Sequence, residues 1–216
     1  DLKVRPPSAS LAYITASGNP ASEYVSVEDL ATHTQVERIK VGSVPYAVAA
    51  SPDGLLVYVA NQASNSVSVI NTGSNTVIAT ILLGNGTSPS GLAVSPDGSY
   101  VYVSNRSTNN ISVINALNNT VLPFRIPADN GPEGIAVSPD GSRIYVVNQN
   151  RGSVSVIEPE SNRLVSSFNT GRTPEGIVIS PDGGMVYVSN YNNASVTVFN
   201  TRTNAVSAIG VGTNPA

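Results

Sequence analysis

The stretch PEGIAVSPDGSRIYVVN, residues 132–148, contains every landmark of a unit that recurs along the chain. A Pro opens the unit, a Ser-Pro-Asp-Gly turn divides it, and Tyr145 and Asn148 lie in its second half. The same turn begins at Ser51, Ser95 and Ser180, at intervals of 42 to 44 residues, with the Pro, Tyr and Asn in the same order. A period of this length indicates a repeat architecture.

Each unit predicts four short strands and no helix. In the turn, Pro fixes φ, Asp bonds to nearby backbone and Gly takes a positive φ. The flanking segments are short apolar, β-branched or alternating runs without a helical period. In the quoted unit we expect strands at residues 134–137, 143–147, 153–157 and 164–168. Four antiparallel strands in about 43 residues describe one blade of a β-propeller.

The predicted fold class is therefore all-β, a single propeller array of four-stranded antiparallel blades over residues 1–216. About five blades are present. The first is incomplete: Tyr13-Ile14-Thr15-Ala16 aligns with Tyr58-Val59-Ala60-Asn61, but the Gly and the Asn are lost. The blades are expected at about 11–41 (partial), 45–84, 89–126, 132–170 and 174–211.

The faces of the predicted strands support blade packing. Val101 and Val103 point one way and Tyr102 the other, while Ile111 and Val113 oppose Ile114. Sheets with two apolar faces are expected between neighbouring sheets. The first strand of each unit carries small residues, which suit the convergence of blades on an axis; examples are Gly91, Ala93, Gly134 and Ala136.

The repeat pattern is cut at the same point at both ends of the chain. Three arrangements are compatible with this. The chain is part of a larger propeller, or a five-blade ring with an incomplete first blade, or an array whose open edge blades pair with a protein partner or a second copy. We favour the first and third arrangements over a finished monomeric ring.

The signature Tyr-Val-x-Asn, with the upstream Pro-x-Gly and the Ser-Pro-Asp-Gly turn, resembles the YVTN family of β-propeller repeats. It occurs at residues 58–61, 102–105, 145–148 and 187–190. The resemblance covers nearly the whole chain. It implies a propeller, usually of seven blades, of a kind common in surface-layer and other exported proteins. Related propellers include lactonase-like enzymes, so the resemblance indicates the fold more strongly than the function.

Composition narrows the function classes. Net charge is −3, only 12% of residues are charged, and cysteine is absent. Disulfides, thiolate metal sites and cysteine nucleophiles are thereby excluded, and no basic stripe suits nucleic acid. No apolar run reaches the roughly 18 residues of a membrane span. Because cytosolic domains average about 25% charged residues, the low charge content favours a secreted or cell-surface protein. Separately, we expect no cofactor.

Asn residues fall into two groups. The repeat Asn is expected to be structural, its amide bonding to backbone in the following loop, at Asn61, Asn105, Asn148 and Asn190. Sequons that glycans can use occur at Asn85, Asn105, Asn110, Asn118 and Asn193. Asn105 belongs to both groups, so it is the least suited to carry a glycan. Asn110 and Asn193 are expected in exposed loops before a third strand.

Few residues suggest chemistry, and we name no catalytic residue. The single histidine, His33, lies in a predicted surface turn without partners. Turn chemistry explains the carboxylates of Asp53, Asp97, Asp140 and Asp182. Glu133 and Glu175 follow the repeat Pro, near one mouth of the central channel, where Tyr46 and Ser90 take the equivalent positions. These four residues are the ligand candidates.

Glu133 and Glu175 are also weak metal candidates, because two carboxylates from adjacent blades can share a cation or a proton. Against this, a hard cation such as calcium takes six or more oxygens. The simpler alternative is that both are solvated or pair with Arg143, Arg151 or Arg172.

The preferred hypothesis is a non-catalytic extracellular or cell-surface scaffold for protein–protein interaction or self-assembly. The alternative is a small-ligand or metal-binding, lactonase-like enzyme that uses the channel mouth. A docking platform like the Trp-Asp repeat propellers is disfavoured, because the chain has no Trp and few charges.

Overall fold

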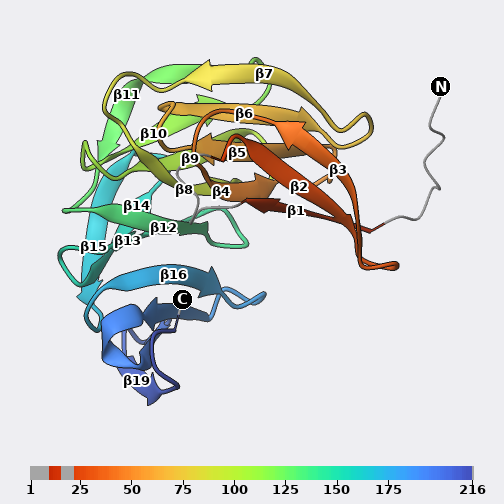
Figure 1. Ribbon diagram of the computed structural model, residues 1–216. Coiled ribbons are helices and arrows are strands. Elements are labelled where there is room, and N and C mark those ends of the chain that lie inside the picture. Colours follow the sequence, from red (N-terminus) through yellow and green to blue (C-terminus); the bar gives the residue numbers. More distant parts are fainter. Residues whose placement is uncertain (1–9, 16–21, 216) are drawn as a thin grey trace.

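The computed structural model describes residues 10–15 and 22–215, which form five antiparallel sheets (Figure 1). Blade 1 has three strands, β1 (Leu11–Thr15), β2 (Tyr24–Asp29) and β3 (Thr34–Lys40). Blade 2 contains β4 (Pro45–Ala50), β5 (Leu56–Asn61), β6 (Ser66–Asn71) and β7 (Thr76–Leu82). Blade 3 contains β8 (Pro89–Val94), β9 (Tyr100–Asn105), β10 (Asn110–Asn115) and β11 (Thr120–Pro127).

Blade 4 contains β12 (Pro132–Val137), β13 (Ile144–Asn148), β14 (Ser153–Glu158) and β15 (Arg163–Asn169). Blade 5 contains β16 (Pro174–Ile179), β17 (Met185–Asn190), β18 (Ser195–Asn200) and β19 (Val206–Gly210), with the short 3₁₀ turn η1 (Tyr191–Asn193) between β17 and β18. Strands within each blade pair in chain order. The all-β propeller class with an incomplete first blade is thus confirmed.

The blades fan around an axis, with blades 1 and 5 at the two ends of an arc (Figure 1). Consecutive inner strands, β4, β8, β12 and β16, contact one another, and β1, which aligns with the second strand β5, contacts β4. Their approach is so close that a Cβ on Gly91 would overlap the carbonyl oxygen of Glu133, and one on Gly134 that of Glu175. Glycine in Pro-x-Gly is therefore required by the neighbouring blade's backbone.

The four Ser-Pro-Asp-Gly turns share one geometry. In blade 3, Gly98 has φ of 74° and its N–H donates to the carbonyl of Ser95. Asp97 Oδ1 accepts from the Ser95 hydroxyl and from the backbone N–H of Ser99. These hydrogen bonds, led by that of the Ser95 hydroxyl, lower the pKa of Asp97. Local chemistry alone accounts for the turn, as the sequence predicts.

Apolar side chains on both faces of each blade form the core. Val101, Val103 and Ile114 of blade 3 pack against blade 2. Tyr102, Ile111 and Val113 of the same blade pack against blade 4. Similar clusters join blades 1 and 2 and blades 4 and 5. The division of faces expected from the sequence is correct, and each interior blade is stabilised from both sides.

The repeat Asn is structural, but its partners differ from those expected. Asn148 is fully buried, and its Nδ2 donates to the hydroxyls of Ser153 and Ser155 on the next strand, at 3.2 and 2.9 Å. We expected bonds to loop backbone. Among the four, Asn190 does accept from a backbone group, the N–H of Gly171. The Asn thus fastens the second strand to the third.

The sequons lie in different environments. Asn85, Asn118 and Asn193 are exposed. Asn105 is fully buried, as its repeat role implies. Asn110 is half-buried rather than exposed, because its Oδ1 accepts from Asn105 Nδ2 at the position that serine fills in other blades.

Within the described part of the chain, the structure has no helix long and apolar enough to cross a membrane.

We predict that Asn148→Ala lowers the free energy of unfolding by about 1–3 kcal/mol, because it removes two buried hydrogen bonds. Among the described residues, the side chain of the exposed Asn150 bonds only to that of Asn130. Asn150→Ala is therefore the matched control and should change stability by about 0.5 kcal/mol at most. Urea unfolding of both variants checks this. Equal effects would show that the buried amide has no special role.

Candidate functional site

The four ligand candidates gather at one end of the inner strands, which we call the channel mouth. Tyr46, Ser90, Glu133 and Glu175 are each the second residue of an inner strand, directly after its Pro. Strand pairing is irregular immediately after each of these Pro residues. Such irregularities re-aim side chains relative to a regular ladder. The repeat therefore presents one variable side chain per blade at the same level.

Glu133 is the most buried charged member of the mouth, with 4% of its surface exposed. The Arg106 guanidinium lies 3.3 Å from its carboxylate. The Tyr46 hydroxyl also lies against this carboxylate, reaching it from two blades away. Neither contact has the geometry of a strong hydrogen bond. The carboxylate is thus paired in charge but incompletely satisfied.

Burial raises the pKa of Glu133 above its usual value, and the negative charge of Glu175 adds to the effect. The Tyr46 contact and the Arg106 charge oppose the rise without cancelling it. Burial, with the adjacent Glu133 carboxylate, likewise raises the pKa of the Tyr46 hydroxyl, which stays protonated. Desolvation therefore dominates the electrostatics of the mouth.

A polar relay joins the two glutamates. Arg106 donates through Nη2 to Gln149 Oε1 at 2.5 Å, and Gln149 Nε2 donates to Glu175 Oε1 at 3.3 Å. Ser90 stands apart from this relay. It is buried, and its hydroxyl donates to the carbonyl of Pro132 at 2.9 Å. Tyr46, Glu133 and Glu175 are brought together, whereas Ser90 joins blade 3 to blade 4.

The arginine partners that we considered for these glutamates are wrong. Arg143 pairs with Glu158 at 3.4 Å and Arg151 with Asp129 at 3.6 Å. Arg172 is exposed and forms no ion pair among the described residues. The actual partner is Arg106, which directly follows the repeat Asn105.

The residue that directly follows the repeat Asn is the sequence feature that could have identified the partner of Glu133. This position holds Gln62, Arg106, Gln149 and Tyr191 in successive blades. It varies as freely as the position after the inner Pro.

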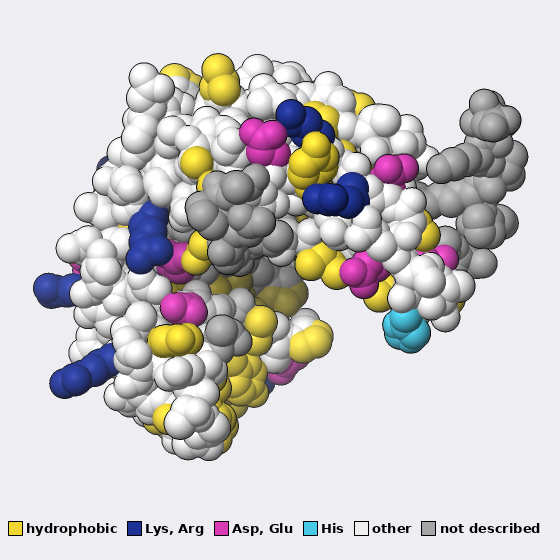
Figure 2. All heavy atoms as spheres, in the orientation of Figure 1, with side chains coloured by type: hydrophobic (Ala, Val, Ile, Leu, Met, Phe, Trp, Pro, Cys, Tyr) yellow, Lys and Arg dark blue, Asp and Glu magenta, His cyan; other side chains and the backbone are white. Residues whose placement is uncertain are grey.

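Other candidate chemistry is sparse. His33 is exposed in the turn between β2 and β3, where Figure 2 shows it at a protruding tip. Within residues 10–15 and 22–215, no group of three or more His, Asp or Glu side chains lies close enough together to hold a metal ion. Glu133 and Glu175 supply two carboxylates, with Arg106 beside one of them. The mouth can form hydrogen bonds to a small polar ligand, and its net charge is negative.

Comparison with known proteins defines the family. The model of the YNCE-like β-propeller family matches residues 8–185. This chain belongs to that family. A comparison with curated protein sequences found no match.

Two solved structures resemble the fold. A chain of Kuenenia stuttgartiensis hydrazine synthase is 27% identical with a TM-score of 0.78, the match covering 87% of this chain and 60% of that one. A functionally unknown protein from Desulfotomaculum acetoxidans DSM 771 is 20% identical with the same TM-score, covering 93% and 65%. This chain therefore spans less than two thirds of either relative.

The raised pKa of Glu133 predicts a pH effect on stability. The folded protein holds this proton more tightly than the unfolded chain, so stability falls as pH rises from about 4.5, the ordinary glutamate value, through the folded pKa. Glu133→Gln cannot titrate and should lack this fall. Urea unfolding across the acidic to neutral range measures it.

The control for this experiment is Glu37→Gln, a change of the same charge on the exposed strand β3. It should keep the pH dependence of the parent protein. If Glu133→Gln also keeps it, Glu133 is not the titrating group.

Proposed function

We propose that this YNCE-like propeller chain is a non-catalytic scaffold that associates with a second copy through the outward face of blade 5. We define the blade-5 face as the apolar side chains of β16 to β19 that point away from blade 4. They are Val178, Tyr187, Val196, Val198 and Ile209. Figure 2 shows hydrophobic side chains bordering the hollow beside this blade.

The main support for this proposal is that residues of blade 5 are exposed at positions that are buried in the core of the other blades. Tyr187 is 36% exposed, whereas its equivalents Tyr58, Tyr102 and Tyr145 are at most 4% exposed. Ile209 is 53% exposed, whereas Ile81, Ile126 and Phe168 are at most 8% exposed. In the other blades these positions are covered by the next sheet. An apolar face of this kind is typical of a protein–protein contact.

The opposite end of the arc is a poor partner for this face. Blades 2 to 5 present a large buried side chain to the preceding blade, at Ile70, Ile114, Ile157 and Phe199. Blade 1 has Glu28 at that position. Head-to-tail contact between copies would bury this carboxylate against apolar side chains, which is costly without a partner. A two-fold contact of one blade-5 face with another avoids that cost, and such self-complementary contacts close into dimers.

We further propose a secreted or cell-surface location. Low charge and absent cysteine are compatible with it. Three sequons are exposed and available for glycans, at Asn85, Asn118 and Asn193. The resemblance to YVTN repeats of exported proteins supports the same location. Detection of glycans at these three Asn residues but not at Asn105, by peptide mass spectrometry of protein from its native host, tests it.

The self-association proposal predicts a dimer in sedimentation experiments. Ile209→Asp should weaken the dimer at least about a hundredfold, because it places an unpaired charge in an apolar contact. Leu117 is 94% exposed in a turn of blade 3, so Leu117→Asp is the matched control and should leave the dimer intact. A monomer at every accessible concentration, or an open-ended polymer, would contradict the two-fold contact.

A further inference from the structure

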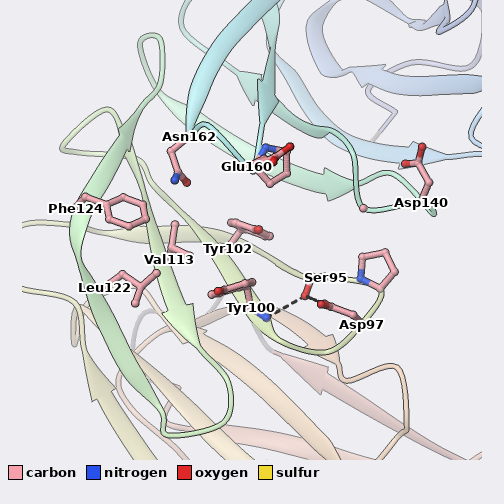
Figure 3. Close-up of a pocket in the computed structure, with 13 residues that line it drawn as sticks. Ser95, Asp97, Tyr100, Tyr102, Val113, Leu122, Phe124, Asp140, Glu160 and Asn162 are labelled. Carbon is pink, nitrogen blue, oxygen red and sulfur yellow. Dashed lines mark hydrogen bonds between the residues drawn. The ribbon is translucent and has the colours of Figure 1, made fainter.

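The end of the propeller opposite the channel mouth holds a cavity of about 550 Å³ between blades 3 and 4 (Figure 3). Its walls come from the Ser-Pro-Asp-Gly turns of both blades, from β9 to β11, and from the turn that joins β14 to β15. A volume of this size suits a small ligand or a side chain with its neighbours. The cavity lies away from the channel mouth, and the core residues Tyr102 and Val113 form part of its wall.

Blade 3 supplies an aromatic wall. Tyr100 and Phe124 line the cavity and are each 38% exposed. The rings of Tyr100 and Tyr102 lie 6.5 Å apart. Figure 3 shows Phe124 and Leu122 at one end of the cavity and the two tyrosines beside them. Exposed rings at a cavity wall offer faces on which a ligand can stack.

This wall arises from a departure from the repeat. Between β10 and β11, residues 122–124 lie opposite the single residue Val113. The outer strands of blades 2 and 4 have one residue fewer there, with only Ile78 or Val165 left unpaired. The longer bulge turns Leu122 and Phe124 toward the cavity. An added residue that breaks the repeat at a cavity points to a role other than packing.

Tyr102 places an unpartnered hydroxyl at the cavity. Its side chain is only 4% exposed, and its hydroxyl forms no hydrogen bond within the described residues, although it lines the cavity. Burial, followed by the nearby Tyr100 and Asp97, raises the pKa of Tyr102 to about 12, so the hydroxyl stays protonated. The hydroxyl is not among the fully buried, unpartnered atoms of the described residues, so it is accessible from the cavity, where it can form a hydrogen bond with a polar ligand atom.

Acidic side chains give the cavity its charge. Asp97, Asp140 and Glu160 line it, and no Lys or Arg does. Hydrogen bonds from the turn serines lower the pKa of both Asp97 and Asp140, which are ionised at neutral pH. Figure 3 shows Glu160 and Asn162 of blade 4 facing the tyrosines of blade 3. The cavity thus attracts cations.

The neighbouring inter-blade cavities also have carboxylates from the turns, but they do not combine them with an aromatic wall and an absence of Lys and Arg. The cavity between blades 4 and 5 includes Arg143 and Arg202. The cavity between blades 2 and 3 has Leu56 where Tyr100 stands here. Of these three cavities in the described part of the chain, only the one between blades 3 and 4 combines several aromatic rings with carboxylates and no Lys or Arg.

We propose that this cavity binds an organic cation, an ammonium group attached to an aromatic or aliphatic body. The ammonium lies near Asp97, Asp140 and Glu160 and against the tyrosine rings, where cation–π attraction adds to the charge. It can donate a hydrogen bond to the Tyr102 hydroxyl. The apolar body covers Leu122 and Phe124. A free amine and a lysine side chain flanked by an aromatic residue share this chemistry.

Titration with phenethylammonium, followed by tyrosine NMR signals, tests the proposal; the chain has no Trp to interfere. Phe124→Ala and Glu160→Gln should each weaken binding about fivefold, from lost stacking and lost charge. Glu37→Gln, remote on the exposed strand β3, is the matched charge control and should bind like the parent. Circular dichroism verifies that each variant is folded.

Two further probes complete the experiment. Neutral 2-phenylethanol has the same ring without the charge and should bind at least about fivefold more weakly. A blocked Lys-Phe dipeptide compares the two sources of the cation: tighter binding than phenethylammonium indicates a protein segment, and weaker binding a free amine, and either supports the cation site. Equal binding of the neutral probe, unchanged binding by both cavity variants, or no saturation at millimolar concentration would overturn the proposal.

Discussion

The packing of each sheet against a neighbour on both faces is the constraint on which the structure depends. A blade of this chain is apolar on both sides, so it cannot bury its side chains alone. Four clusters join the five blades in chain order. The same requirement fixes Pro-x-Gly at the axis, because Gly91 and Gly134 lie against the backbone of the next inner strand. The sequence repeats because the same packing contact occurs between each blade and the next.

The features that the sequence predicted well are local or periodic. The turn at Ser95 to Gly98 is held by its own side chains, so four residues suffice to predict it. The opposed faces of Tyr102 and Val103 follow from strand alternation. The partners of Asn148 and Glu133 were harder to predict, because they depend on strand register and on the distance between blades. Arg106 is far from Glu133 in the chain, and only the packing of blade 3 on blade 4 brings them together.

Positions whose residue type varies between the repeats are those where a functional side chain can be placed without disturbing the fold. Buried positions such as Val59 and its equivalents scarcely change, because a different volume would disturb two blades. By contrast, the residues after the inner Pro and after the repeat Asn vary among the blades, and two of the latter, Arg106 and Gln149, contact the glutamates of the channel mouth. At the opposite end, the longer bulge near Pro123 alters one inter-blade cavity only. A regular scaffold thus holds two candidate sites at opposite ends, both at positions that depart from the repeat.

The two ends of the arc differ in a way that the repeat alone does not explain. Blade 5 keeps the apolar residues that an adjoining sheet would cover, among them Tyr187 and Ile209. Blade 1 has exchanged a core position for Glu28 and is one strand short among the described residues. If both ends met equivalent partners, the same packing rule would act on both and keep the same residue types. This divergence of residue types supports the proposed contact at blade 5 over one at blade 1.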